Sequence, residues 1–177
     1  MISTTTTRER PMNVSAWEVR AIRDGRKTQT RRVVKSQPLF DDLKPYWTAA
    51  STDRKSVGKW KWGRRDHIGS IVTVGDIFPC PFGQPGDLMR TLSRQPESLR
   101  IKSVRIERVQ DISEADAISE GFPGSFSPAF FDGWEMVGPD GEMPSQEFAK
   151  QFDIDNGPNS WDANPWVWVI EHERITK

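Results

Sequence analysis

The segment at residues 165–175 constrains the fold more than any other part of the sequence. Its side chains alternate between two faces, as they do in an extended strand, and both faces are apolar. One face carries Trp166, Trp168 and Ile170, and the other carries Val167 and Val169. Because neither face gains from contact with water, such a strand has to be covered on both sides. The pattern therefore predicts a strand in the middle of a small barrel.

The remaining segments predict short helices and further strands. Ser15 and Glu18 have the spacing of a capping box, which starts a helix that ends at Gly25, with Glu18 facing outward. In the stretch 99–109 the apolar positions change parity, which predicts a strand with a bulge near 102–103. Further strands are expected at 10–14, 28–34 and 71–74, and further helices at 113–120 and 144–152.

This order of elements predicts an α+β fold. We expect a small, partly open β-barrel with two to three short helices packed at its ends, because the strands lack the spacing of parallel βαβ units. The chain of 177 residues is expected to form a single domain, 1–177. Within it, 1–9 is expected to be flexible, and 35–69 and 122–143 are expected to be long loops or insertions, since they show no clear periodicity.

The composition excludes several classes of protein. No apolar run approaches ~20 residues, so we expect no membrane span and a cytoplasmic location. A single cysteine, Cys80, excludes an internal disulfide, and we expect it to be packed rather than nucleophilic. The two histidines lack the spacing of zinc ligands, so no metal and no cofactor are expected.

The charges are distributed unevenly along the chain. Residues 1–88 carry 16 Lys and Arg against 9 Asp and Glu, whereas residues 89–177 carry 9 against 16. A polyanion should therefore favour surfaces built by the first half of the chain. If the two halves interleave in the fold, this difference disappears.

The run Gly-Arg-Lys-Thr-Gln-Thr-Arg-Arg at residues 25–32 is the first candidate functional segment. It follows directly on the helix end, and its four cations repel one another, so it adds little to stability. A solvated basic turn is the alternative. At residues 59–65, cations alternate with tryptophans. This pattern is typical of a surface that binds single-stranded nucleic acid, in which aromatic rings stack on bases and cations bind phosphates. The alternative there is that the tryptophans fix a loop to the core.

Four blocks of sequence occur in the same order as in a known family. They are Gly-Arg-Lys-Thr-Gln-Thr at 25–30, Pro-Gly-Asp at 85–87, Ile-Ser-Glu-Ala-Asp-Ala at 112–117, and Trp-Asp-Ala-Asn-Pro-Trp-Val-Trp-Val-Ile-Glu at 161–171. Over nearly its full length the chain resembles the ASCH-domain proteins of phages and prophages. The resemblance implies a β-barrel like that of the PUA superfamily, whose members bind RNA or modified bases, and a bacterial host cell.

The motif also resembles that of an ASCH amidohydrolase, which removes the acetyl group from N4-acetylcytidine. This resemblance implies Lys27, Thr30 and Glu120 as catalytic residues. Thr30 would be the nucleophile, and Lys27 would take its proton if neighbouring cations lowered the pKa of that lysine. Glu120 would orient the lysine or handle the proton of the leaving amine. The residues expected to bind substrate or nucleic acid are Arg26, Thr28, Arg31, Arg32, Lys59, Trp60, Lys61, Trp62 and Arg64.

The chain departs from the family pattern after Asp87. Family members continue into a strand with an aromatic residue and then Val-Arg-Glu, whereas residues 88–94 here read Leu-Met-Arg-Thr-Leu-Ser-Arg. We expect that strand to be missing or rebuilt. The long segments 35–69 and 122–140 indicate a larger or different ligand.

Three functions are compatible with these patterns. The first is recognition of RNA or a modified nucleoside in a cleft at the motif, with hydrolysis of an N4-acyl cytidine amide. The second is a non-catalytic RNA-binding module or a ribonuclease, which a continuous basic face joining the two basic segments would favour. The third is a phage accessory protein that acts through protein contacts.

Overall fold

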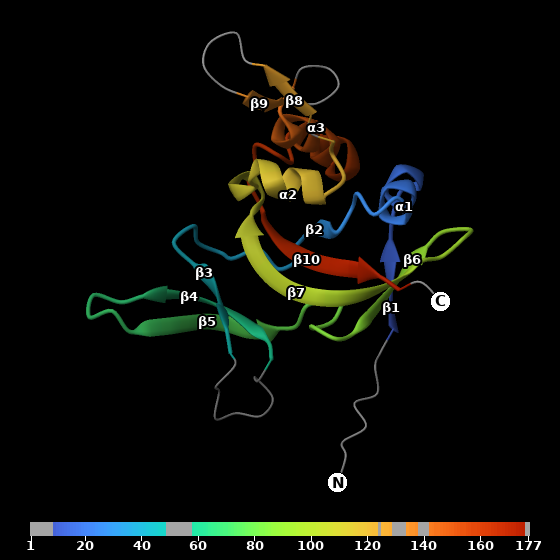
Figure 1. The fold of residues 1–177 in the computed structure, drawn as a ribbon. Coiled ribbons are helices and arrows are strands. Elements are labelled where there is room, and N and C mark those ends of the chain that lie inside the picture. Colours follow the sequence, from blue (N-terminus) through green and yellow to red (C-terminus); the bar gives the residue numbers. More distant parts are fainter. Residues whose placement is uncertain (1–8, 49–57, 124, 129–133, 138–141, 176–177) are drawn as a thin grey trace.

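A computed structural model describes residues 9–48, 58–123, 125–128, 134–137 and 142–175 of the chain. It has the expected mixture of helices and strands, arranged as two larger sheets, a small two-stranded sheet and three α-helices (Figure 1). The described strands do not close into a barrel, so the barrel stays a prediction.

The larger sheet has five strands in the order β1-β6-β7-β10-β2. Strands β1 and β6 are parallel, and the other neighbours are antiparallel. The central strand β10 pairs with both β7 and β2, so its backbone is hydrogen-bonded along both edges. The strands are β1 (Glu9–Asn13), β2 (Gln29–Val33), β6 (Leu88–Leu92), β7 (Ser98–Arg108) and β10 (Trp166–Arg174).

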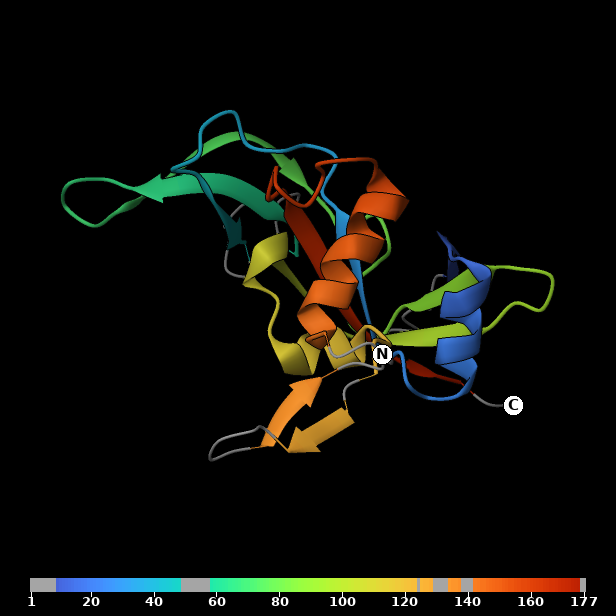
Figure 2. The same ribbon diagram turned by 90° about the horizontal axis from the view of Figure 1, so that it is seen from above.

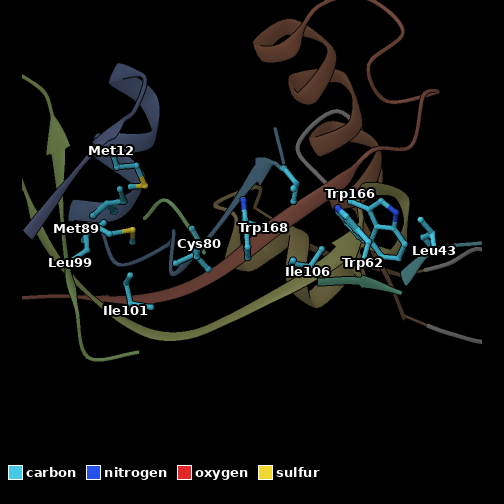
Figure 3. Packing of buried hydrophobic residues seen from close by; sticks show 13 residues of the cluster. Met12, Leu43, Trp62, Cys80, Met89, Leu99, Ile101, Ile106, Trp166 and Trp168 are labelled. Carbon is cyan, nitrogen blue, oxygen red and sulfur yellow. The ribbon is translucent and has the colours of Figure 1, made fainter. Parts of the chain in front are cut away.

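Both faces of β10 are covered, as the sequence predicts. Trp166, Trp168 and Ile170 belong to a core cluster on one face of the sheet, which Figure 3 shows in part. Val167 and Val169 belong to a second cluster on the other face. The first cluster is closed by the second sheet, and the second cluster is closed by helices.

The second sheet has three antiparallel strands in the order β3-β4-β5. They are β3 (Lys44–Trp47), β4 (Trp60–Arg65) and β5 (Ile71–Phe78). The prediction of a loop over 35–69 is therefore wrong for β3 and β4. Short strands with lysine, proline and tryptophan give little apolar alternation, and their stability comes from covering the first core cluster. A hairpin of β8 (Ser125–Pro128) and β9 (Trp134–Val137) likewise lies within the predicted loop 122–143.

The three helices begin where the sequence predicts. They are α1 (Ala16–Arg23), α2 (Glu114–Ser119) and α3 (Pro144–Asn156), and a 3-10 turn, η1 (Val109–Asp111), precedes α2. The capping box of α1 is present: the Ser15 hydroxyl accepts from the Glu18 amide, and the Glu18 carboxylate accepts from the Ser15 amide. Figure 2 shows α3 crossing over the five-stranded sheet, where Phe148 and Phe152 pack in the second core cluster.

Two details of the large sheet follow from its sequence. Glu171 pairs with Ser103 and His172 with Ile101, so Lys102 is the extra residue of a bulge, at the predicted place. A strand does follow Asp87: β6 pairs with both β1 and β7. Of the two expected alternatives, a missing strand is wrong, and a rebuilt strand stays a prediction. Met89 and Thr91 of this strand are fully buried.

We predict that Ile170→Ala lowers the free energy of unfolding by about 2–5 kcal/mol, because it leaves a cavity in a fully buried site at the centre of the sheet. Ile154→Ala is the matched control, since that side chain is 75% exposed, and its effect should stay within about 0.5 kcal/mol. Urea denaturation followed by circular dichroism measures both. Equal losses in the two variants would contradict the position of β10.

Candidate ligand-binding pocket

A pocket of about 400 Å³ lies where α1, α3 and the end of α2 meet the start of β2. Its wall combines charged and aromatic side chains from segments that are far apart in the sequence. The charged residues are Glu18, Lys27, Arg31, Arg32, Glu120 and Asp155, and the aromatic residues are Trp17, Phe122, Phe148 and Phe152.

Two glycine-terminated helix ends bring the central residues of this pocket together. Gly25, at φ +73°, lets the chain turn back after α1, and the amides of Arg26 and Lys27 both donate to the Ala21 carbonyl. Gly121, at φ +102°, follows α2 and lies so close to Lys27 that a Cβ there would stand 3.3 Å from the lysine Cβ. The two turns direct Lys27 toward the end of α2, where Glu120 lies.

Lys27 and Glu120 form a buried ion pair. The Lys27 Nζ lies 2.7 Å from Glu120 Oε2, and it also donates to the Glu120 carbonyl at 3.0 Å. Their side chains are only 1% and 2% exposed. A second carboxylate, that of Glu18, lies 3.7 Å from the same ammonium. Charged hydrogen bonds of this kind offset part of the cost of removing the ions from water.

Arg31 extends this ion pair into a network. Its fully buried guanidinium contacts Glu120 at 3.4 Å, Glu107 at 3.2 Å and Asp116 at 3.1 Å, and it also donates to the Gln29 side chain. Burial alone would raise the pKa of Asp116. The hydrogen bond from Gln29 and the charge of Arg31 outweigh burial, so the pKa of Asp116 lies below its ordinary value.

Glu18 lies inside the network, so the prediction that it faces outward is wrong. It is 5% exposed and accepts from Arg32 at 3.0 Å while it also caps α1. Burial would raise its pKa, but the charges of Arg32 and Lys27 outweigh burial and lower it. The helix face that carries Glu18 turns toward β2 because the cations of the motif provide the counter-charge.

The base role predicted for Lys27 depends on the cations around it. Arg26 is exposed and pairs with Asp24, and Arg32 pairs with Glu18. The charged groups in direct contact with the Lys27 ammonium are carboxylates. Each cation of the motif folds next to an acid, so the condition on which the base role of Lys27 was predicted, an influence of neighbouring cations, is offset by carboxylates.

The structure brings Lys27 and Glu120 together but leaves Thr30 outside the pocket wall. The Thr30 side chain is fully buried, and its hydroxyl forms a hydrogen bond with His172 Nε2 at 3.2 Å. Thr28, by contrast, is exposed. On the described surface, the predicted nucleophile is thus not accessible to a ligand in this pocket.

His172 is a buried polar residue that the sequence analysis did not select. Burial, together with the charges of Lys27 and Arg32, lowers its pKa to about 3, so its imidazole is neutral. The one signal in the sequence was its position in a strand predicted to be buried on both sides. The aromatic wall, with Phe122 and Phe148, was also missed, because these residues come from a predicted loop and from the predicted helix 144–152, for which no ligand contact was expected.

The second basic segment lies on the other sheet. Trp62 is buried in the core, where it stacks on Phe78 at 5.1 Å and donates to the Ser36 carbonyl. Trp60 is half-buried and packs against Trp168. The prediction that these tryptophans bind bases is corrected for Trp62, whose ring is covered by protein. The alternative, that they fix the segment to the core, is confirmed for it.

Among the described residues, no continuous basic face joins the two segments. Arg31 is fully buried among acids, and Arg64 pairs on the surface with Asp42 at 2.9 Å. Lys59 precedes β4 and Lys61 lies within it, in the three-stranded sheet. Many acids of the second half pair with cations of the first half, so the uneven charge of the sequence is largely compensated in the fold.

The remaining expectations concern Cys80, metal ions and membrane spans. Cys80 is buried as expected, and burial raises the pKa of its thiol to about 11, which keeps it protonated. Within the described ranges, there is no group of three or more His, Cys, Asp or Glu side chains that could hold a metal ion. The same ranges contain no helix long and apolar enough to cross a membrane.

Comparisons with known proteins identify no family or activity for this chain. No protein-family model matches the chain. A search of curated proteins gives no match either. Among solved structures, the crystal structure of hypothetical protein PH0355 matches with a TM-score of 0.47 and 14% identity, covering 95% of this chain and 100% of that chain. Neither the family nor the activity of the chain follows from this likeness.

We predict that Glu120→Ala costs about 3–5 kcal/mol of stability, because it leaves the ammonium of Lys27 buried with one fewer carboxylate. The matched control is Asp42→Ala, which removes an exposed carboxylate from Arg64 and should cost at most about 1 kcal/mol. Chemical denaturation of both variants measures the difference. Similar losses would show that the Lys27–Glu120 pair is exposed to solvent.

We also predict that His172 makes stability depend on pH. The unfolded chain protonates this histidine below its ordinary pKa of 6.5, whereas the folded chain does so only near 3. The free energy of unfolding should therefore fall as the pH drops from 6.5, by up to about 1.4 kcal/mol per pH unit for this group. Urea denaturation between pH 6.5 and about 5 should show a smaller slope for His172→Gln than for wild type. His67→Gln is the control, and equal slopes for wild type and His172→Gln would contradict the prediction.

Proposed function

We propose that this protein binds a small, uncharged, modified nucleoside in the pocket around Lys27 and Glu120. The observation that carries the proposal is a wall in which aromatic rings stand beside buried, paired charges. A nucleobase needs both: a flat apolar surface for its ring, and fixed donors and acceptors for its polar edge. The volume of about 400 Å³ is in the range of small-ligand sites.

The aromatic part of the wall is continuous. The rings of Trp17 and Phe122 lie 5.3 Å apart, and those of Phe122 and Phe148 lie 5.7 Å apart. Stacking of one base on such a ring contributes about 1–3 kcal/mol. The indole N–H of Trp17 is buried and has no acceptor among the described residues.

The charge balance favours a nucleoside over an RNA strand. Three cations and three carboxylates line the pocket, and most of them are already paired with one another. A polyanion would find no excess of positive charge here. A neutral ligand can instead use the paired groups as fixed dipoles without breaking them.

The resemblance of the motif blocks to ASCH-domain proteins points to the same ligand class. In this proposal the fold is a divergent relative of the PUA-like barrel, and the protein acts in the cytoplasm of a bacterial host of a phage or prophage. Lys27 and Glu120, which the resemblance assigns to catalysis, are the two residues at the centre of the pocket.

Amide hydrolysis is the second candidate function, and the 2.7 Å contact between Lys27 and Glu120 favours it. In this scheme water attacks the acyl carbon of an N4-acyl cytidine, and Glu120 accepts the proton of that water. The Lys27 ammonium stabilises the charge that develops on the carbonyl oxygen. Glu120 then gives the proton to the amine as the C–N bond breaks. Thr30 has no direct role in this scheme.

We predict that N4-acetylcytidine binds to the wild type with an affinity that isothermal titration calorimetry can measure. Phe148→Ala should weaken binding by about 1–3 kcal/mol through lost stacking. Arg64→Ala, which changes a cation outside the pocket, is the matched control and should leave binding unchanged. Binding of single-stranded RNA that weakens steeply with salt, with no binding of the nucleoside, would contradict the proposal.

Chromatography of the same mixtures tests hydrolysis separately. If the second candidate holds, cytidine accumulates with the wild type and not with Glu120→Gln, whose side chain has nearly the same shape but cannot accept the proton. Circular dichroism has to show that this variant is folded. Binding without product in the wild type would leave the protein as a nucleoside-binding module.

A further inference from the structure

A second pocket, of about 490 Å³, borders the first core cluster. The segment 79–87 forms one of its walls, and the end of β3, the start of β4 and the middle of β7 form the others. Trp60 and Cys80 in its lining pack in the first cluster, whereas Phe148 and Phe152 connect the pocket around Lys27 to the second cluster, on the other face of β10. The two pockets have no lining residue in common, so they are separate sites.

Two indole rings form the apolar part of this second pocket, which we call the tryptophan pocket. Trp47 and Trp60 are opposite each other on β3 and β4, and their ring centroids lie 5.1 Å apart. The core holds Trp60 in place, because its ring packs edge-on against Trp168 at 6.1 Å. Trp47 is 44% exposed, although a large aromatic ring gains from leaving water. Together with Val104, the two rings offer an apolar surface that a ligand can cover.

The cation in the wall of this pocket, Arg10, has no counter-ion among the described residues. It is half-buried, and its Nη1 donates to the Pro81 carbonyl at 2.9 Å and to the Cys80 carbonyl at 3.4 Å. These neutral groups fix the guanidinium but do not compensate its charge. The Cys80 thiol does not compensate it either, because burial raises the pKa of the thiol to about 11 and keeps it protonated. A carboxylate on a ligand would supply the missing charge.

The anion in the same wall, Asp87, is likewise without a counter-ion in the part of the chain that the structure describes. It is half-buried, and its Oδ2 accepts from the Gln84 amide at 3.1 Å, which fixes the carboxylate. Because Arg10 and Asp87 form no ion pair with each other, the pocket carries two separate and opposite charges. Such charges attract a ligand more strongly near a protein surface than in bulk water, since the effective dielectric constant is lower there.

We propose that the tryptophan pocket binds a free α-amino acid with an apolar side chain. The carboxylate of the amino acid pairs with Arg10, its ammonium pairs with Asp87, and its side chain lies against Trp47 and Val104. A simple acid would leave Asp87 without a counter-ion, and a simple amine would leave Arg10 without one, whereas a zwitterion compensates both. The volume of about 490 Å³ is in the range of small-ligand sites.

Isothermal titration calorimetry with three related compounds tests the class of ligand. The probe is L-phenylalanine, and its analogues are 3-phenylpropanoate, which lacks the ammonium, and 2-phenylethylamine, which lacks the carboxylate. Phenylalanine should bind to the wild type, and each analogue should bind at least about tenfold more weakly, because one charge of the pocket stays uncompensated. A wild type that does not bind phenylalanine, or that binds either analogue as tightly, would overturn the proposal.

Two charge variants test the role of each residue. Arg10→Gln should weaken the binding of phenylalanine by about tenfold or more, but it should not weaken that of 2-phenylethylamine. Asp87→Asn, whose side-chain carbonyl can still accept from the Gln84 amide, should weaken the binding of phenylalanine but not that of 3-phenylpropanoate. Arg64→Gln is the matched control, because this cation lies outside the pocket, and it should change nothing. Equal weakening of all three compounds by one variant would overturn the pairing, since a distorted pocket has that effect.

The indole N–H signals of the ¹⁵N-labelled protein locate the binding site. Phenylalanine should shift the signal of Trp47, assigned by its loss in Trp47→Phe, while the signal of Trp17 in the other pocket stays in place. A shift of the Trp17 signal without one of the Trp47 signal would overturn the proposal. Because the two pockets are separate, this result is independent of whether a nucleoside binds near Lys27.

Discussion

The buried ion pair between Lys27 and Glu120 is the interaction around which the pocket is built. It joins the turn after α1 to the end of α2, and Glu18 and Arg31 attach α1 and β2 to the same pair. Buried ions lose much of their hydration on folding. Replacing a buried ion pair with well-packed apolar residues therefore often leaves the stability of a protein unchanged or raises it. The four buried charges of this network therefore need not be the most stable way to fill this space.

In the proposed function, recognition of a polar ligand gives these charges a use. The network holds donors and acceptors in fixed positions beside the rings of Trp17 and Phe148, so a bound base would meet a surface that is already arranged. Because the positive and negative groups balance, the proposed pocket would select for shape and hydrogen bonding rather than for negative charge. The same balance argues against the RNA surface that the basic segments of the sequence indicated.

The sequence predicts the backbone of this fold better than the contents of its site. The capping box, Gly25, the bulge at Lys102 and the doubly buried β10 all follow from local patterns. Strands β3 and β4 do not, because their stability comes from the core that they cover. Lys27 and Glu120 were found through a motif resemblance. Glu18 was misplaced because a capping role at a helix start explains it fully without tertiary contacts, and His172 was missed because a lone histidine in a strand carries no local signal.

The most direct measurement is the indole N–H spectrum of the ¹⁵N-labelled protein during titration with N4-acetylcytidine. The Trp17 signal, assigned by its loss in Trp17→Phe, reports on the pocket wall, and the Trp62 signal reports on the core. Binding in the pocket predicts a saturable shift of the Trp17 signal while the Trp62 signal stays in place. An unchanged Trp17 signal at saturating nucleoside would contradict the assignment of this pocket.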